Sequence, residues 1–190
     1  MQSERKVLTI VIVAAFALAF VAGVLLGPEI LGRAGSASSG AGESAGWRFQ
    51  NPLLGAQPGE WTVHRVMNGV MMRLEILSVH PLTHAVTLRD ERRDPKNDKI
   101  VGSSVLEVGT NHFLFGFESA GGVVTSVYPD EITVAGRSWR CLCVETSSPT
   151  MGPVRSWYSP EVPTTGLLKQ ERGGGGPHAV TAELISFKKD

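Results

Sequence analysis

The sequence contains few cysteines and no excess of charge of either sign. Only two cysteines occur in 190 residues, too few for a domain held together by disulfide bonds, although this does not exclude an oxidising compartment. Eighteen basic residues balance eighteen acidic ones, so no long-range field attracts nucleic acid or an anionic surface. We therefore expect neither a disulfide-stabilised miniprotein nor a nucleic-acid-binding protein.

Residue arrangements typical of enzymes are also scarce. The sequence has no Gly-x-Ser-x-Gly nucleophile motif. The run Gly173–Gly176 leads to Pro177 rather than to a helix beginning with Lys-Ser/Thr, so we interpret it as a hairpin loop and not as a phosphate-binding loop. The sequence therefore predicts no catalytic residue and no cofactor.

Two pairs of potential metal ligands remain. His80 and His84 are four residues apart, a spacing that suits a metal only on a helix, whereas Pro81 and the surrounding β pattern indicate turn and surface histidines. Cys141 and Cys143 share one face of a predicted strand, where we expect packed thiols. We predict no metal site, and a metal or redox site at the cysteines stays open as an alternative.

The longest apolar run lies near the N-terminus. Residues Val7–Leu26 carry no charge, and about twenty such residues match a hydrocarbon core of ~30 Å. Arg5 and Lys6 precede the run, so the positive-inside rule places the N-terminus in the cytoplasm and the remaining chain outside it. A cleaved signal peptide is the alternative, although its apolar region would be shorter. We predict a single-pass signal-anchor in a bacterial inner membrane.

A segment of low complexity separates this run from the rest of the chain. Residues 32–46 are almost entirely Gly, Ala and Ser, a composition typical of a flexible tether. The predicted organisation is a cytoplasmic tip (1–6), a transmembrane helix (7–26), a tether (27–46) and an antiparallel β-domain (47–190) that is periplasmic or otherwise extracytoplasmic.

From Trp47 onward the pattern is that of short strands. Apolar and polar residues alternate on either side of Asn68-Gly69, a pair typical of a type I′ hairpin turn. Further strands are predicted at VVTSVY, EITV, WRCLCVE and AVTAELISF, and DERRDPKNDK (90–99) is interpreted as a charged, solvated turn. Helical periodicity is absent after the anchor. We expect a mainly β domain with one strongly curved antiparallel sheet or an open β-barrel.

The segment RSWYSPEVPTTGLLK contains two prolines and a glycine near its middle. Pro160 and Pro163 cannot donate to a sheet and keep the chain extended, and Gly166 can bend it back. We predict that this segment crosses between strands along an edge of the sheet.

Three segments together carry a resemblance: NPLLGAQPGEWTVHRV (Asn51–Val66), EITVAGRSWRCLCVE and WYSPEVPTTGLLK. The combination resembles a family of uncharacterised bacterial exported or membrane-anchored β-domains, which have an Asn-Pro…Gly-Asp/Glu-Trp segment and a Trp-x-Ser…Val-Pro…Gly-x-x-Lys segment. The resemblance covers Asn51 to Phe187. The strand order is more remotely similar to the lipoprotein-carrier type of curved sheet, which implies an apolar ligand on a concave face.

We therefore expect a membrane-tethered, non-enzymatic β-domain that binds an apolar ligand or an envelope protein. A structural or assembly component without a ligand is the main alternative. The apolar residues predicted to line a ligand-binding face are Val70, Met72, Leu74, Ile76, Phe113, Phe115 and Phe117.

Overall fold

The computed structural model describes residues 49–109, 123–149, 152–173 and 179–190. The predicted transmembrane helix, the tether and the strand with Phe113, Phe115 and Phe117 lie outside these ranges. Within the described ranges, no helix has the length and apolar character needed to cross a membrane.

Nine strands form one antiparallel sheet, so the prediction of a mainly β domain is confirmed. The strands are β1 (Trp61–Val66), β2 (Met71–Val79), β3 (Val86–Arg93), β4 (Ile100–Val108), β5 (Val123–Val134), β6 (Arg137–Ser148), β7 (Gly152–Tyr158), β8 (Leu167–Arg172) and β9 (Ala179–Lys188). Helical structure in the described part of the chain is limited to two short 3-10 segments, η2 (Pro52–Gly55) and η3 (Met67–Gly69).

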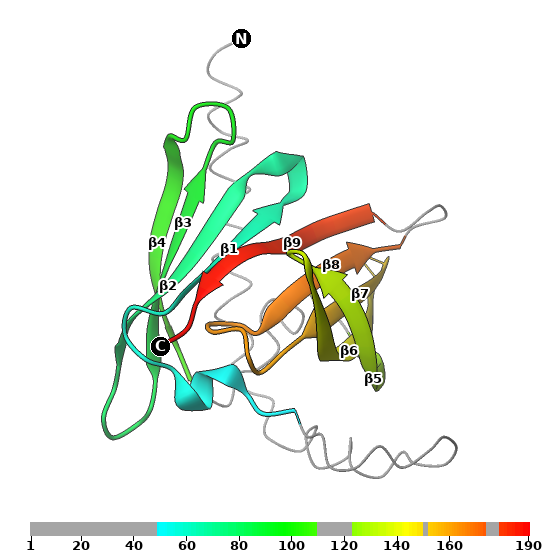
Figure 1. The fold of residues 1–190 in the computed structure, drawn as a ribbon, viewed down its shortest axis with the longest axis horizontal. Coiled ribbons are helices and arrows are strands. Elements are labelled where there is room, and N and C mark those ends of the chain that lie inside the picture. The colour runs from blue at the N-terminus through cyan, green and yellow to red at the C-terminus, as the bar shows by residue number, and fades with distance from the viewer. Residues whose placement is uncertain (1–48, 110–122, 150–151, 174–178) are drawn as a thin grey trace.

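The described strands form one open sheet in which neighbours in sequence lie side by side, except for β4 and β5. The sheet runs β4-β3-β2-β1-β9-β8-β7-β6-β5, so the first and last strands pair with each other at its centre. Every neighbouring pair is antiparallel, and β4 and β5 form the two ends (Figure 1). The described sheet is therefore open between β4 and β5.

The sheet curls strongly along its β5–β9 half. The rings of Trp139 on β6 and Phe187 on β9 lie 5.7 Å apart, although β7 and β8 separate these strands in the sheet. Such a contact requires the strands to coil around a shared interior, as Figure 1 shows. Trp139 and Phe187 belong to a cluster that also contains both cysteines, Trp157 and Leu184.

The predicted hairpin between β1 and β2 is confirmed. Asn68 and Gly69 have φ angles of 65° and 77°, both in the left-handed region that a type I′ turn requires. The turn fixes the register, in which Thr62 lies opposite Leu74 and His64 opposite Met72.

Two predicted boundaries are wrong. Strand β3 continues through Asp90 to Arg93, so only the last part of the predicted charged turn is a turn. Asp90 is buried, whereas a solvated loop would expose it. VVTSVY and EITV form one continuous strand, β5, because Pro129 lies on an end strand, where a missing N–H is tolerated.

The proline-containing segment does not run along an edge of the sheet. It connects β7 and β8, which are neighbours inside the sheet. The loop is closed by Ser159 N, which donates to Gly166 O at 2.8 Å, and its Val162 is fully buried. Gly166 has a φ of 72°, as the predicted bend requires. The segment therefore folds back against the sheet and becomes part of the core.

Candidate functional site

The predicted apolar face is only partly assembled among the described residues. Met72, Leu74 and Ile76 alternate along β2, whereas Val70 precedes the strand and is half-buried. Ile76 is 1% exposed and belongs to a closed cluster with Leu53 and Leu88. Segment η2 thus covers this end of β2, and Ile76 is a core residue.

Buried polar side chains attach the β7–β8 loop to β1. The hydroxyl groups of Thr62 and Thr164 lie 2.8 Å apart, and both residues are fully buried. His64 Nε2 lies 2.8 Å from the carbonyl oxygen of Leu167. Because a carbonyl can only accept, Nε2 carries the proton and donates. The loop is therefore held by hydrogen bonds as well as by apolar packing.

His64 is a residue that the sequence did not reveal as special. It is fully buried, and its Nδ1 has no hydrogen-bond partner among the described residues. Burial lowers the pKa of His64 below 6.5, and the hydrogen bond to Leu167 opposes this shift without cancelling it. His64 is thus a neutral imidazole that anchors a loop.

Other buried polar atoms do not form a recognisable catalytic or metal site. Glu60 Oε1 and Asp90 Oδ1 also have no hydrogen-bond partner within the described ranges. In those ranges, no group of three or more His, Cys, Asp or Glu side chains is placed to hold a metal ion. His80 and His84 are exposed in the β2–β3 turn, in agreement with their interpretation as turn and surface histidines.

The two cysteines are free and buried. Cys141 Sγ donates to the carbonyl oxygen of Asp130 at 3.4 Å. Burial raises the pKa of the Cys141 thiol to about 12 and also raises that of Cys143. Both sulfurs are thus held as thiols, the form that is a poor nucleophile and a poor metal ligand.

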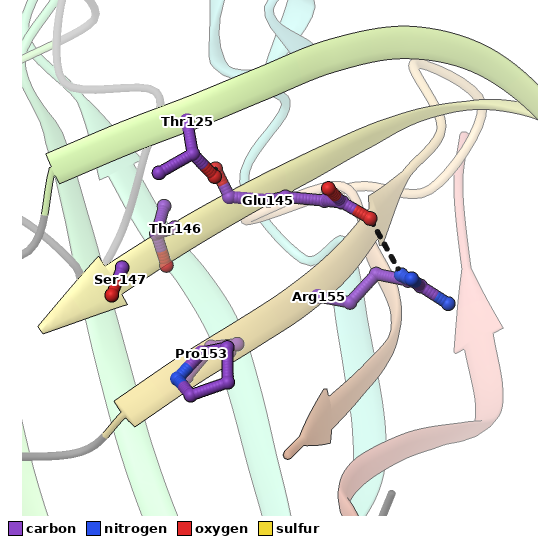
Figure 2. A pocket seen from close by; sticks show the side chains of 7 residues that line it. Thr125, Glu145, Thr146, Ser147, Pro153 and Arg155 are labelled. Atoms are coloured by element: carbon purple, nitrogen blue, oxygen red, sulfur yellow. Dashed lines mark hydrogen bonds and ion pairs between the residues drawn. The ribbon is translucent and has the colours of Figure 1, made fainter. Parts of the chain in front are cut away.

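A groove of about 300 Å³ crosses β5, β6 and β7 (Figure 2). The residues lining it are Thr125, Glu145, Thr146, Ser147, Pro153, Val154 and Arg155. Arg155 Nε donates to Glu145 Oε1 at 2.9 Å, and Tyr128 donates to the same oxygen at 3.1 Å. The remaining lining supplies hydroxyl groups and short apolar side chains, which suits hydrogen bonding to an extended polar segment.

The sequence did not indicate this groove. Its residues come from three strands and meet only through strand pairing, in which Glu145 lies opposite both Arg155 and Ser126. Thr125 is left out of the ladder by a register shift, and its hydroxyl donates to Glu145 O at 3.2 Å. Any strand with a solvent-exposed face shows alternating polar residues such as Ser, Thr, Glu and Arg. This pattern therefore did not distinguish the groove from an ordinary sheet surface.

Comparisons with known proteins give one structural likeness. No protein-family model matches the sequence, and no curated protein matches it either. A crystal structure described as a "putative lipoprotein" from Parabacteroides distasonis is 14% identical, with a TM-score of 0.46, and the match covers 74% of this chain and 97% of that one. A likeness of this extent does not assign the chain to a family, so the resemblance to exported β-domains stays a prediction.

Proposed function

We propose that this chain is a membrane-tethered, non-enzymatic β-domain on the outer side of a bacterial inner membrane, where it binds an extended segment of an envelope protein. The apolar run Val7–Leu26 with Arg5 and Lys6 before it supports the tether and its orientation. The observation that carries the binding role is the groove across β5, β6 and β7.

The surroundings of the groove fit a protein segment better than a small substrate. Val123 and Val127 are exposed on β5, the end strand that borders the groove. Thr125 lies between them and lines the groove. A strand at the end of a sheet offers backbone hydrogen bonds, and the neighbouring side chains select what binds. The residues lining the groove include no pair of a nucleophile and a general base.

Site-specific photo-crosslinking in intact cells tests this proposal. A photoreactive amino acid at Thr125 should give a discrete adduct with an envelope protein, whereas the same group at Thr133, exposed on the same strand but away from the groove, should not. Replacing Arg155 with Ala should weaken the Thr125 adduct, because it removes the ion pair at the groove. Equal adducts from both positions would contradict the proposal.

An apolar ligand is the second candidate function. Met72, which lies opposite His64, is half-buried, whereas Ile76 is buried. The face of β2 is therefore less completely covered at Met72 than at Ile76. A ligand there would be recognised by apolar contact. An environment-sensitive apolar dye that binds the full chain and is displaced by lipid would favour this candidate over the envelope protein.

A further inference from the structure

The strands β1 to β4 have one highly charged end and one uncharged end. The charged end carries the β1–β2 hairpin and the β3–β4 turn, which lie side by side because an added Cβ at Gly69 would be 3.6 Å from Pro95 Cγ. In this region, eight of the ten residues 90–99 are charged. The uncharged end carries η2 and the β2–β3 turn, where residues 51–59 and 77–88 contain no Asp, Glu, Lys or Arg. The two ends therefore suit different surroundings.

Two leucines protrude from the uncharged end. Leu82 in the β2–β3 turn is 84% exposed and Leu54 in η2 is 71% exposed, which makes them the two most exposed large apolar side chains within the described ranges. Leu53, next to Leu54, packs in one cluster with Val86, the first residue after the β2–β3 turn. Both leucines therefore protrude from the same end of the domain, which is the lower end in Figure 1.

The backbone of the β2–β3 turn has its hydrogen-bond donors satisfied. His80 Nδ1 accepts from Leu82 N at 3.3 Å and from Thr83 N at 3.1 Å, and Pro81 has no N–H to satisfy. The other donors of the turn bond to backbone or hydroxyl oxygens, in the pairs His80 N to Ala85 O, His84 N to His80 O and Ala85 N to Thr83 Oγ1. Because an unsatisfied N–H is costly away from water, this turn can present Leu82 to an apolar medium at low cost.

The chain enters the domain at this same end. Asn51 caps η2 with its side chain, and the predicted tether ends five residues earlier, at residue 46. Figure 1 shows the first described residues leading into η2 at the lower end of the sheet. A coil of this composition spans only about 20 Å over about fifteen residues. The predicted tether therefore keeps the uncharged end, with its two exposed leucines, close to the bilayer.

We propose that the uncharged end of the domain docks on the surface of the bilayer that holds the predicted anchor, with Leu54 and Leu82 inserted beneath the lipid headgroups. Apolar side chains at such a boundary bind through the area that they bury. The proposal rests on the proposed tether but not on the groove. β7 begins beside the groove at Pro153 and ends at the loop whose Gly166 lies against Pro52 of η2, so docking turns the groove away from the bilayer.

Fluorescence quenching by labelled lipids tests the docking. The full chain is reconstituted into vesicles of phosphatidylethanolamine and phosphatidylglycerol, with or without a nitroxide near the top of the acyl chains. An environment-sensitive fluorophore attached at Leu54→Cys or Leu82→Cys should be quenched by the nitroxide. Met67→Cys is the matched control, because Met67 is apolar, 57% exposed and in the hairpin at the charged end, and it should not be quenched. Cys141 and Cys143 are buried, so the label reaches the introduced thiol.

A charge at one leucine tests whether both insert together. Leu54→Asp in the labelled Leu82→Cys chain should lower the ratio of docked to undocked protein by about tenfold or more, and most of the quenching at position 82 should be lost. Met67→Asp in the same chain should leave the quenching unchanged. Leu54 and Met67 are exposed, so both variants keep the fold.

The result that supports the proposal is quenching at positions 54 and 82 but not at 67, with loss of the signal in the Leu54→Asp chain. Flotation of the vesicles separates failure of the docking from failure of the tether. A chain that floats with the vesicles without quenching at 54 and 82 would overturn the docking alone, and a chain that does not float would overturn the tether and the docking together. Equal quenching at 67 and 82 would also overturn the docking, because the charged end would then lie as deep as the uncharged end.

Discussion

His64 shows how one buried side chain makes the stability of this domain depend on pH. Its imidazole donates to Leu167 O through Nε2, and Nδ1 has no described partner. Protonation would create a buried cation with an unsatisfied N–H. The pKa of His64 is lowered in the folded protein, so the unfolded chain binds the proton more readily. Stability contributed by neutral His64 is therefore present above the unfolded pKa near 6.5, and it is lost as the pH falls from there through the lowered pKa of the folded protein.

The measurement is the free energy of unfolding by urea between pH 8 and pH 5. We expect it to fall by up to about 1.4 kcal/mol per pH unit below pH 6.5 because of His64. His64→Gln keeps a donor for Leu167 O but cannot titrate, so this part of the pH dependence should disappear. All other residues are identical in the two proteins, so their contributions cancel in the comparison. An unchanged slope in the variant would contradict the role assigned to His64.

Gly166 is a second residue whose identity follows from its surroundings. Its φ is 72°, and an added Cβ would lie 3.0 Å from Pro52 Cγ and from Ser159 O. Gly166→Ala should therefore destabilise the domain by about 2–4 kcal/mol through backbone strain and crowding together. The variant Gly136→Ala measures backbone strain without crowding, because Gly136 has a φ of 73° but nothing lies within 4 Å of an added Cβ.

Gly136→Ala should lower the unfolding free energy by about 1 kcal/mol. Urea unfolding of the two variants measures the difference directly. If Gly166→Ala and Gly136→Ala lowered the unfolding free energy by the same amount, the contact between the β7–β8 loop and η2 would be looser than the structure describes.

At the scale of elements, η2 determines whether the apolar face of β2 is covered. Leu53 is 2% exposed and packs with Ile76 and Leu88, whereas Leu54 beside it is 71% exposed. Leu53→Ala should lower the unfolding free energy by about 2–5 kcal/mol and raise the binding of an apolar dye to the folded protein. Leu54→Ala should change neither. Strong dye binding to the unmodified chain, with displacement by lipid, would instead favour an apolar ligand.

The same elements show how far the sequence predicted the fold. The β1–β2 hairpin was predictable because Asn68 and Gly69 determine their turn locally. The extension of β3 through Asp90 to Arg93 was not, because charged residues stay in a strand only when neighbouring strands pair with them, as β2 and β4 do here. Within β3 itself, Arg92 forms an ion pair with Asp90. The strand through Pro129 likewise depends on a position at the end of the sheet, which is a property of the complete topology.

The candidate site was less predictable than the fold. Glu145 and Arg155 are ten residues apart and form an ion pair only because β6 and β7 pair in one particular register. The same holds for His64 and Leu167, which are 103 residues apart in sequence. Contacts of this kind depend on long-range pairing, which periodicity along the chain does not specify.

At the scale of the whole molecule, an open nine-stranded sheet follows a predicted N-terminal anchor. The sheet places its packed interior in the β5–β9 half and the groove at β5–β7, with β4 at the other end. A tether of the predicted kind restricts a domain to one side of a membrane and raises its encounter rate with other envelope proteins. The sidedness of the domain is therefore the premise on which the proposed function rests.

The most direct test of this premise is the activity of β-galactosidase, a reporter active only in the cytoplasm, fused after Asp190. The positive residues Arg5 and Lys6 before the apolar run predict an exported C-terminus and hence an inactive fusion. The same fusion to a chain without residues 1–26 is the control and should be active, because nothing then exports it. Full activity of the complete fusion, equal to that of the control, would place the domain in the cytoplasm and contradict the account.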